Sequence, residues 1–209
     1  MSTNKLHKFY NKDYYYYNYV KPLYFRSGLG NIYFLYISYF CTILPIKLKR
    51  GDKVLDFGCG VGNWTWALRK FGIDVYGIDP SIDAKQFSRE PRFCIYKDTK
   101  VLPFKDEYFE AVFSSDVLEH IEKKDLKTYI KELSRVCKKN MIHIIGVSDK
   151  GKGIIEDPTH LTKENEAWWK DELSKYDYKV STGNKFYFFP QALSLIKQKK
   201  LISAFKTGY

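Results

Sequence analysis

The sequence predicts a doubly wound α/β fold built on a seven-stranded, mostly parallel sheet. Strand-like and helix-like segments alternate through most of the 209 residues, and repeated strand–helix units of this kind form parallel sheets. A glycine-rich segment directly follows the first expected strand, which is where such sheets bind ligands. The last two expected strands are joined by a short turn at residues 182–184, so the final strand is expected to run antiparallel.

The individual elements follow from apolar periodicity and from the turn residues between the periodic segments. The expected strands cover residues 53–57, 73–79, 93–97, 110–115, 140–147, 177–182 and 185–189. The expected helices cover residues 62–71, 81–88, 124–138 and 163–175. Pro190 can open one more helix, whose apolar side chains and lysines suit either packing on its own domain or contact with an anionic membrane surface.

Residues 1–50 are expected to form a helical, aromatic cap on a domain that covers residues 51–209. The first half of this cap is rich in tyrosine and includes an unbroken run from Tyr14 to Tyr17. Such a segment can close over a substrate cleft as a lid, or it can pack as an ordinary helix. Residues 31–46 are strongly apolar but shorter than the roughly 20 residues that cross a bilayer, which indicates a buried helix.

Composition indicates one globular domain in a reducing compartment. A chain of 209 residues with 44% hydrophobic residues can bury a full core. Residues 1–18 are polar and lack the apolar stretch of a signal peptide. The cysteines form no Cys-x-x-Cys pair, so neither a zinc knuckle nor a disulfide framework is indicated; they are Cys41, Cys59, Cys94 and Cys137. We therefore expect a cytoplasmic protein.

The net charge of +11 is concentrated at the two ends of the chain. Residues 1–50 contribute +7 and residues 180–209 contribute +5, whereas the segment between them is nearly neutral at −1. Basic flanks of this kind attract phosphates, nucleic acid or an acidic membrane surface. Lysines on ordinary solvated faces would produce the same charge distribution, and the sequence alone leaves both explanations open.

The glycine-rich segment has the spacing Asp56-x-Gly58-x-Gly60-x-Gly62. This spacing differs from the Gly-x-Gly-x-x-Gly that places a helix N-terminus against a diphosphate. A carboxylate just before the loop would repel phosphate and attract an ammonium or sulfonium group. Asp79 ends the next strand, where an acidic residue can accept hydrogen bonds from both ribose hydroxyls, and Asp98 ends the third, where it could accept from an adenine amino group.

With these motifs the chain resembles the class I S-adenosylmethionine-dependent methyltransferases, a Rossmann-like group that includes the methyltransferase type 11/12-like families. The resemblance runs from about residue 53 to residue 179 and includes the segment from Ala111 to His120. It implies S-adenosyl-L-methionine as cofactor. The residues that it implies for cofactor binding are Asp56, Gly58, Cys59, Gly60 and Gly62 in the loop, Asp79 and Pro80 at the ribose, Asp98 and Thr99 at adenine, and Ser115 beneath the sulfonium.

Two segments bring carboxylate and imidazole together where the acceptor should bind. One runs from Asp116 to His120 and the other from Asp157 to His160. Because methyl transfer needs a base only when the acceptor must lose a proton, His160, with His120 and Asp157, is a candidate for that role. A structural role for either histidine is an equal alternative. His143 lies among isoleucines in the fifth strand and is expected to be a core residue.

A metal site is a further alternative, because Asp116, Glu119, His120 and His160 offer oxygen and nitrogen ligands. The Asp-x-x-Glu-His run is similar to the Glu-x-x-Glu-His of quinone-pathway O-methyltransferases and small-RNA 3′-end methyltransferases, some of which use a divalent ion. Here Asp replaces the first Glu and a second nearby histidine pair is absent from the sequence. The prediction is therefore a site without metal.

The sequence therefore predicts O- or N-methylation of a small acceptor, with a sugar or a phosphate-bearing molecule as candidates. Asp157-Pro158-Thr159-His160 and the Trp168-Trp169 pair resemble a branch of these methyltransferases that acts on sugars and other small metabolites. The alternative is an RNA or other nucleic-acid methyltransferase that uses the basic flanks. A binding module without catalytic activity is a third reading, against which the complete set of glycines and aspartates argues.

Overall fold

The computed structural model describes residues 9–22, 28–148, 158–176, 178–183 and 199–206. The chain forms two compact units, Met1–Thr99 and Lys100–Tyr209. The expected boundary between a cap and a domain at residue 50 stays a prediction.

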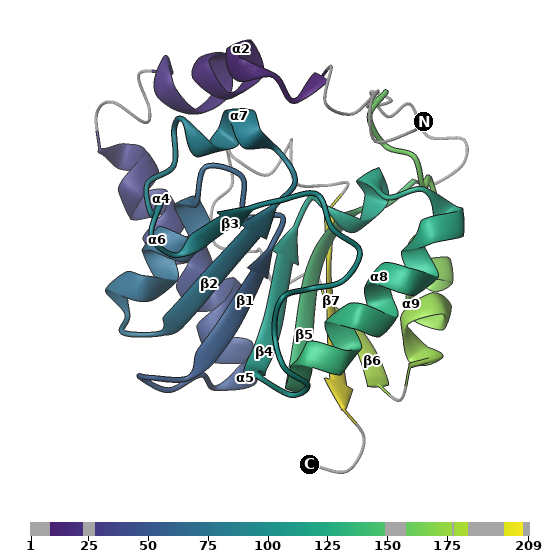
Figure 1. Ribbon diagram of the computed structural model, residues 1–209. Coiled ribbons are helices and arrows are strands. Elements are labelled where there is room, and N and C mark those ends of the chain that lie inside the picture. The colour runs from purple at the N-terminus through teal and green to yellow at the C-terminus, as the bar shows by residue number, and fades with distance from the viewer. Residues whose placement is uncertain (1–8, 23–27, 149–157, 177, 184–198, 207–209) are drawn as a thin grey trace. The chain divides into compact units, whose positions relative to one another are not determined.

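Three parallel strands form the sheet of the first unit, in the order β3-β2-β1. They are β1 (Lys53–Phe57), β2 (Asp74–Asp79) and β3 (Cys94–Tyr96), and Figure 1 shows them side by side. Between them lie the helices α6 (Asn63–Lys70) and α7 (Ile82–Lys85). The strand register places Leu55 opposite Tyr76, so β1 and β2 end together at the glycine-rich loop.

The N-terminal part of the first unit is helical. α2 (Lys12–Tyr15) continues as the π-helical turn η1 (Tyr16–Val20). α4 (Leu29–Ser38) continues through η2 (Tyr39–Ile43) into α5 (Leu44–Ile46). Asn11 caps α2 by accepting from the amide of Tyr14.

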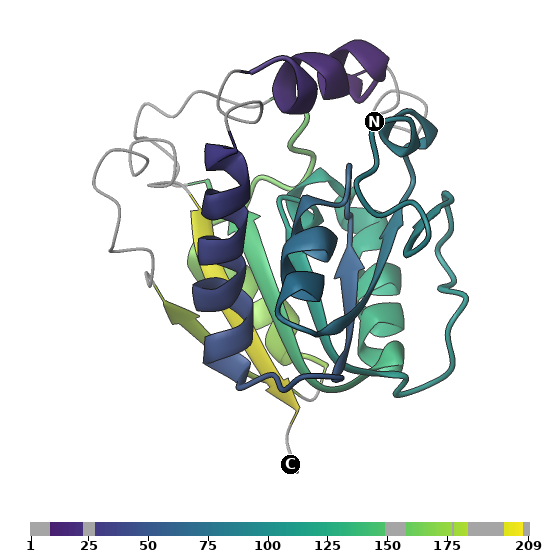
Figure 2. The ribbon, with the colours of Figure 1, turned by 90° about the vertical axis from the view of Figure 1, so that its left-hand side faces the viewer.

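α4 packs beside α6, as Figure 2 shows, with the rings of Phe34 and Trp64 6.4 Å apart. Phe34, Ile37 and Cys41 are buried, whereas Leu29 and Ile32 are exposed. By length and composition alone, Leu29–Ile46 is apolar enough to cross a membrane, with a mean hydropathy of 1.5 over 18 residues. The helix is thus longer than predicted, and its inner face lies on the first unit.

The second unit contains two parallel strands, β4 (Phe109–Ser115) and β5 (Cys137–Gly146). Its helices are η3 (Leu118–His120), α8 (Lys123–Val136) and α9 (Glu166–Ser174). α8 buries Leu126, Ile130 and Leu133, whose spacing places them on one face of the helix. The parallel strands of the two units, three in one and two in the other, confirm the Rossmann-like α/β prediction.

The end of the chain differs from the prediction. β6 (Tyr178–Gly183) and β7 (Lys199–Lys206) pair antiparallel, and β7 also pairs antiparallel with β5. Gly183 pairs with Leu201, so no tight turn at residues 182–184 joins the two strands. Residues 185–189 lie outside the described part of the chain.

The terminal helix predicted from Pro190 onward is wrong for Lys199–Lys206, which form a strand. This segment is almost continuously apolar from Leu201 to Phe205, and such short runs fit a helix or a buried strand equally well. The segment pairs with β5, which lies far away in the sequence. This pairing satisfies its backbone groups and stabilises the strand over the helix.

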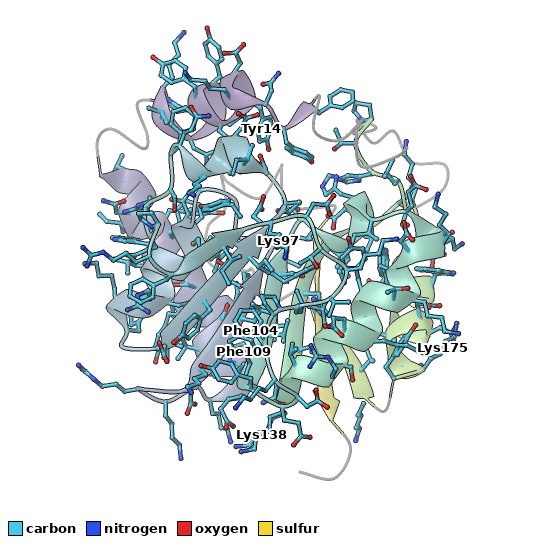
Figure 3. All side chains as sticks on the ribbon, viewed as in Figure 1. Tyr14, Lys97, Phe104, Phe109, Lys138 and Lys175 are labelled. Carbon is cyan, nitrogen blue, oxygen red and sulfur yellow. The ribbon has the colours of Figure 1, made fainter. Side chains whose placement is uncertain are left out.

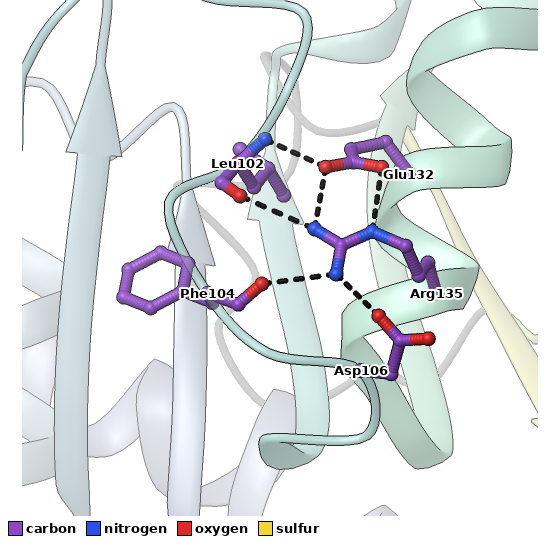
Figure 4. Close-up of polar contacts among 5 residues, drawn as sticks. All are labelled: Leu102, Phe104, Asp106, Glu132 and Arg135. Atoms are coloured by element: carbon purple, nitrogen blue, oxygen red, sulfur yellow. Dashed lines mark hydrogen bonds and ion pairs between the residues drawn. The ribbon is translucent and has the colours of Figure 1, made fainter.

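An ionic network holds the segment before β4 against α8 in the second unit (Figure 4). Arg135 donates to both carboxylate oxygens of Glu132, at 2.8 and 2.6 Å, and to Asp106 at 2.6 Å. It also donates to the carbonyls of Leu102 and Phe104, at 3.2 and 2.9 Å. Figure 3 shows the Phe104 ring beside that of Phe109, with the centroids 4.7 Å apart.

Candidate active site

The glycine-rich loop leaves β1 in a conformation that favours glycine at three positions. Gly58, Gly60 and Gly62 have φ values of 77°, 51° and 77°, in the left-handed region. The amides of Gly58 and Cys59 both donate to the carbonyl of Ile78, at 2.8 and 3.2 Å. The loop is therefore tied to the end of β2, where Asp79 lies.

Asp79 holds the backbone on both sides of itself. Its Oδ2 accepts from the amide of Gly60 and its Oδ1 from the amide of Ser81, each at 2.8 Å. A carboxylate offers about four acceptor positions, so it can accept from more than two donors at once. A Cβ at Gly60 would meet no atom within 4 Å, so the space beside this residue is open. Loop and carboxylate thus fit a ribose-bearing cofactor.

Asp56 lies behind the loop and is 1% exposed. Its Oδ2 accepts from the hydroxyl of Thr65 at 2.7 Å, which connects the end of β1 to α6. Burial raises the pKa of Asp56 to about 7, although the hydrogen bonds from Thr65 oppose the shift. The geometry indicates that Asp56 positions α6 through Thr65. The sequence motif did not identify Thr65 as its partner.

The remaining adenosine-binding candidates lie at the carboxyl ends of β2 and β3. Pro80 directly follows Asp79 and is exposed. Asp79 and Tyr96 are register partners, and the amide of Lys97 donates to the carbonyl of Asp79 at 2.9 Å. Asp98 and Thr99 come directly after this bond, and Asp98 is exposed. Two neighbouring strands of one unit thus supply both predicted carboxylates.

The tyrosine-rich segment packs as a helix on the glycine-rich loop and α7, one of the two arrangements expected from the sequence, and its role as a lid stays a prediction. Tyr15 is buried against Val61 of the loop and Ala84 of α7. Tyr96 also packs there, and its hydroxyl donates to the carbonyl of Gly60 at 3.0 Å. Burial raises the pKa of Tyr15, and the nearby Asp79 raises it further. Tyr15 lies in the tyrosine run that the sequence singles out, whereas no sequence motif indicated Tyr96.

The second unit brings His120 and His160 together, with ring centroids 4.8 Å apart and an edge-to-face arrangement. Nδ1 of His120 lies 3.0 Å from the carbonyl oxygen of Thr159. Because a carbonyl only accepts, Nδ1 carries the hydrogen, and Nε2 is the basic nitrogen of the neutral ring. The two histidines come from segments that the sequence analysis treated as separate candidates.

Glu119 anchors this cluster and is fully buried. Its Oε1 accepts from the amide of Gly146 at 2.6 Å, and its carbonyl accepts from the amides of Leu161 and Thr162. A Cβ at Gly146 would lie 2.7 Å from Cε1 of His160 and 2.9 Å from Oε1 of Glu119. Gly146 therefore allows the close approach of these side chains. In the sequence, the only signal for this close approach is a glycine at the end of the fifth expected strand.

Glu119, His120 and His160 could hold a divalent metal ion, since their ligand atoms all lie within 4.8 Å of one another. Asp116 is outside this group; its φ of 56° is left-handed, and its Oδ2 accepts from the hydroxyl of Ser115 at 3.2 Å. Asp157 lies outside the described residues. The prediction of a site without metal stays a prediction.

His143 is a core residue, as predicted. Its Nδ1 lies 2.7 Å from the hydroxyl of Ser114 on the neighbouring strand. Burial lowers the pKa of His143 to about 3, so the ring is neutral. Its Nε2 has no hydrogen-bond partner among the described residues.

Comparison with known proteins agrees with this geometry. Residues 55–145 match the family described as "Methyltransferase domain". This match and the names of the relatives support the resemblance to class I, S-adenosylmethionine-dependent methyltransferases that the sequence shows.

Two curated relatives and one solved structure illustrate the match. Phosphoethanolamine N-methyltransferase 1 of Zea mays is 34% identical over 98 residues, which are 42% of this chain and 20% of that protein. The ubiquinone biosynthesis O-methyltransferase of Pelagibacter ubique is 33% identical over 120 residues, 52% of this chain and 49% of that protein. The chain thus spans about a fifth to a half of the length of these two relatives.

The solved structure of magnesium protoporphyrin IX methyltransferase from Synechocystis PCC 6803 with bound SAH has the same fold. Its TM-score is 0.70 at 17% sequence identity, and the alignment covers 99% of this chain and 100% of that one.

Proposed function

We propose that the protein is an S-adenosylmethionine-dependent methyltransferase that methylates an oxygen or nitrogen of a small acceptor. The observation that carries this proposal is the bond between the Gly60 amide and Asp79, which joins a left-handed glycine loop to the carboxylate that ends the next strand. This arrangement suits a nucleoside cofactor whose charged end is not a phosphate.

The first unit supplies the cofactor site. Backbone groups of the loop from Gly58 to Gly62 face the methionine part, Asp79 accepts from the ribose hydroxyls, and Asp98 with Thr99 lies at the adenine edge. The cofactor supplies a methyl group that is already activated by positive sulfur. The protein then has to align the acceptor and exclude water.

The second unit supplies the residue that manages the acceptor's proton. We assign this role to His120, because the carbonyl of Thr159 holds its ring in the tautomer with a basic Nε2. Glu119 and His160 position the ring, the first through the Gly146 amide and the second by direct ring contact. Ser115 at the end of β4 stays the candidate for the region beneath the sulfonium.

The names of the relatives support a small acceptor. One is named a phosphoethanolamine N-methyltransferase and another a ubiquinone biosynthesis O-methyltransferase, so the names include both N- and O-methylation. A sugar or a phosphate-bearing molecule remains the proposed class for this chain, and the cytoplasm its proposed location. The alternative is a nucleic acid held by the basic flanks.

We also infer a complete seven-stranded sheet with β7 antiparallel, supported by the pairing of β7 with β5 and β6.

Two measurements test the proposal. Calorimetry with S-adenosylhomocysteine should show saturable 1:1 binding, and absence of binding would refute the cofactor assignment. S-adenosylmethionine carrying a tritiated methyl group should then label the small-molecule fraction of a cell extract. Label that appears only in RNA, together with RNA binding that weakens steeply with salt, would favour the nucleic-acid alternative.

A further inference from the structure

Two buried cysteines lie together beneath the glycine-rich loop. Cys59 belongs to the loop and Cys94 begins β3, and each is 7% exposed. Gly77 of β2 lies between them: a Cβ at this position would be 2.7 Å from the sulfur of Cys59 and 2.9 Å from that of Cys94. Both sulfurs thus occupy the space over a single glycine, and only the missing side chain makes room for them.

The two thiols also interact directly. A hydrogen bond between them lowers the pKa of Cys94 and raises the pKa of Cys59. The thiol of Cys94 also donates to the hydroxyl oxygen of Thr65 at 3.9 Å, which orients this sulfur beside the loop. Cys94 is therefore the better nucleophile of the pair, and Cys59 is placed as its resolving thiol.

We propose that Cys59 and Cys94 are a thiol-modification site, at which a hydroperoxide oxidises the pair to a disulfide. The nearby Gly62 supports this assignment, since a Cβ there would lie 3.3 Å from the sulfur of Cys94. Two glycines on different elements thus leave room for this one sulfur. In a reducing compartment such a disulfide is transient and reports oxidation.

The reaction balances with hydrogen peroxide as the oxidant. The Cys94 thiolate attacks one peroxide oxygen, the O–O bond breaks, and the hydroxide that leaves takes up a proton to become water. This step produces a sulfenic acid on Cys94. The sulfur of Cys59 then attacks the sulfur of Cys94; the S–S bond forms, the S–O bond breaks, and the Cys59 proton leaves with the hydroxide as a second water.

The disulfide would distort the loop that the proposed function assigns to the cofactor, and this consequence rests on that function. An S–S bond is about 2.05 Å long, much shorter than a contact between two thiols. Cys59 must therefore move toward β3, and its neighbour Gly60 carries the amide that binds Asp79. We expect the affinity for S-adenosylhomocysteine to fall at least about tenfold, reversibly, in the oxidised protein.

Peptide mapping tests the modification without any cofactor. The purified full chain is treated with hydrogen peroxide, its remaining thiols are blocked, and the digest is analysed by mass spectrometry. The expected product is the Cys59–Cys94 cross-link, which disappears on reduction. Cys41→Ser and Cys137→Ser are the matched controls and should retain it, whereas Cys59→Ser and Cys94→Ser should lose it.

Two results would overturn the proposal: oxidation of these cysteines to sulfinic or sulfonic acids without a cross-link, or protection of both thiols in the folded protein. The peptide map of the wild type alone can detect either result, even where a serine variant does not fold. Calorimetry on the reduced and oxidised wild type then separates the two hypotheses. Failure of the reduced protein to bind S-adenosylhomocysteine refutes the proposed function, whereas the cross-link is scored independently.

Discussion

The amide of Gly60 donates to Oδ2 of Asp79 over 2.8 Å, so a charged acceptor at the end of β2 fixes the backbone of the loop that follows β1. The other oxygen of Asp79 accepts from the amide of Ser81, at the start of the turn into α7. One carboxylate thereby sets the conformation of two segments next to the proposed cofactor.

The substitution Asp79→Asn should weaken cofactor binding. An asparagine amide can accept one of the two backbone bonds but turns an NH2 group toward the other donor. We expect the affinity for S-adenosylhomocysteine to fall about 10- to 100-fold, corresponding to about 1–3 kcal/mol. Calorimetry measures this, with Asp74→Asn at the other end of β2 as the control. Equal affinity of the wild type and Asp79→Asn would contradict the assignment.

Replacing His120 by Gln should slow methyl transfer and leave cofactor binding intact. Glutamine can still donate to the Thr159 carbonyl but has no nitrogen that takes up a proton. The rate should fall about 10²- to 10⁴-fold, as it does when a general base is lost. Initial rates on the labelled acceptor fraction measure this, together with the pH profile, whose rising limb should vanish in the variant.

The same assay separates the base from a metal ion at Glu119, His120 and His160. Because His120 is proposed to act without metal, the wild-type rate should survive treatment with EDTA. A loss of activity that Mg²⁺ or Mn²⁺ restores would instead assign these side chains as metal ligands.

Asp56 should make the fold less stable as the pH rises. Its pKa is about 7 in the folded chain, against about 3.9 in the unfolded chain, so the folded state binds more protons between these values. The free energy of unfolding of the wild type should therefore fall relative to Asp56→Asn, by up to about 4 kcal/mol between about pH 4 and pH 8. Urea denaturation of both proteins across this range measures the difference, and parallel curves would show that folding does not shift the pKa of Asp56.

His143 should make the fold less stable as the pH falls, which is the opposite of the effect of Asp56. Its pKa of about 3 in the folded chain lies below the ordinary value of about 6.5, so the unfolded state binds the extra proton between them. Stability contributed by the neutral ring should be lost as the pH falls from about 6.5 to 3, by up to about 5 kcal/mol. The double variant His143→Leu with Ser114→Ala should lack this acid sensitivity in urea denaturation, and equal sensitivity would contradict it.

Arg135→Lys should destabilise the second unit although the charge is kept. A lysine ammonium cannot match the paired oxygens of Glu132 and also reach Asp106 and the carbonyls of Leu102 and Phe104. We expect a loss of about 1–3 kcal/mol in the free energy of unfolding. Thermal denaturation measures it, with Lys131→Arg at an exposed position of α8 as a control. No change would show that the network is not coupled to folding.

Most strands could be predicted because their signals are local. β1 and β2 are apolar segments bounded by glycine and aspartate, and the predicted 53–57 and 73–79 agree with Lys53–Phe57 and Asp74–Asp79. β7 could not be predicted in this way, because its partner β5 is more than fifty residues earlier in the chain and its own composition does not distinguish strand from helix.

The candidate site, too, could be predicted only where its residues lie close together in the sequence. The glycines and Asp79 follow from sequence spacing, since they surround one strand–loop–helix unit. The contacts of Glu119 with Gly146, of His120 with Thr159 and of Asp56 with Thr65 depend on the folded chain, and no periodicity or motif encodes them. The sequence therefore identified the two histidines but not what holds them.

In a saturation mutagenesis library, position 146 should tolerate no residue other than glycine. A single methyl group there would overlap with the imidazole of His160 and the carboxylate of Glu119, so even alanine should be depleted under selection for activity. Gly60, beside open space, should tolerate residues that accept a positive φ, such as asparagine, under selection for folding alone, and lose them under selection for activity, because that space is assigned to the cofactor. The two glycines thus differ in the origin of their constraint, crowding for one and chain conformation for the other.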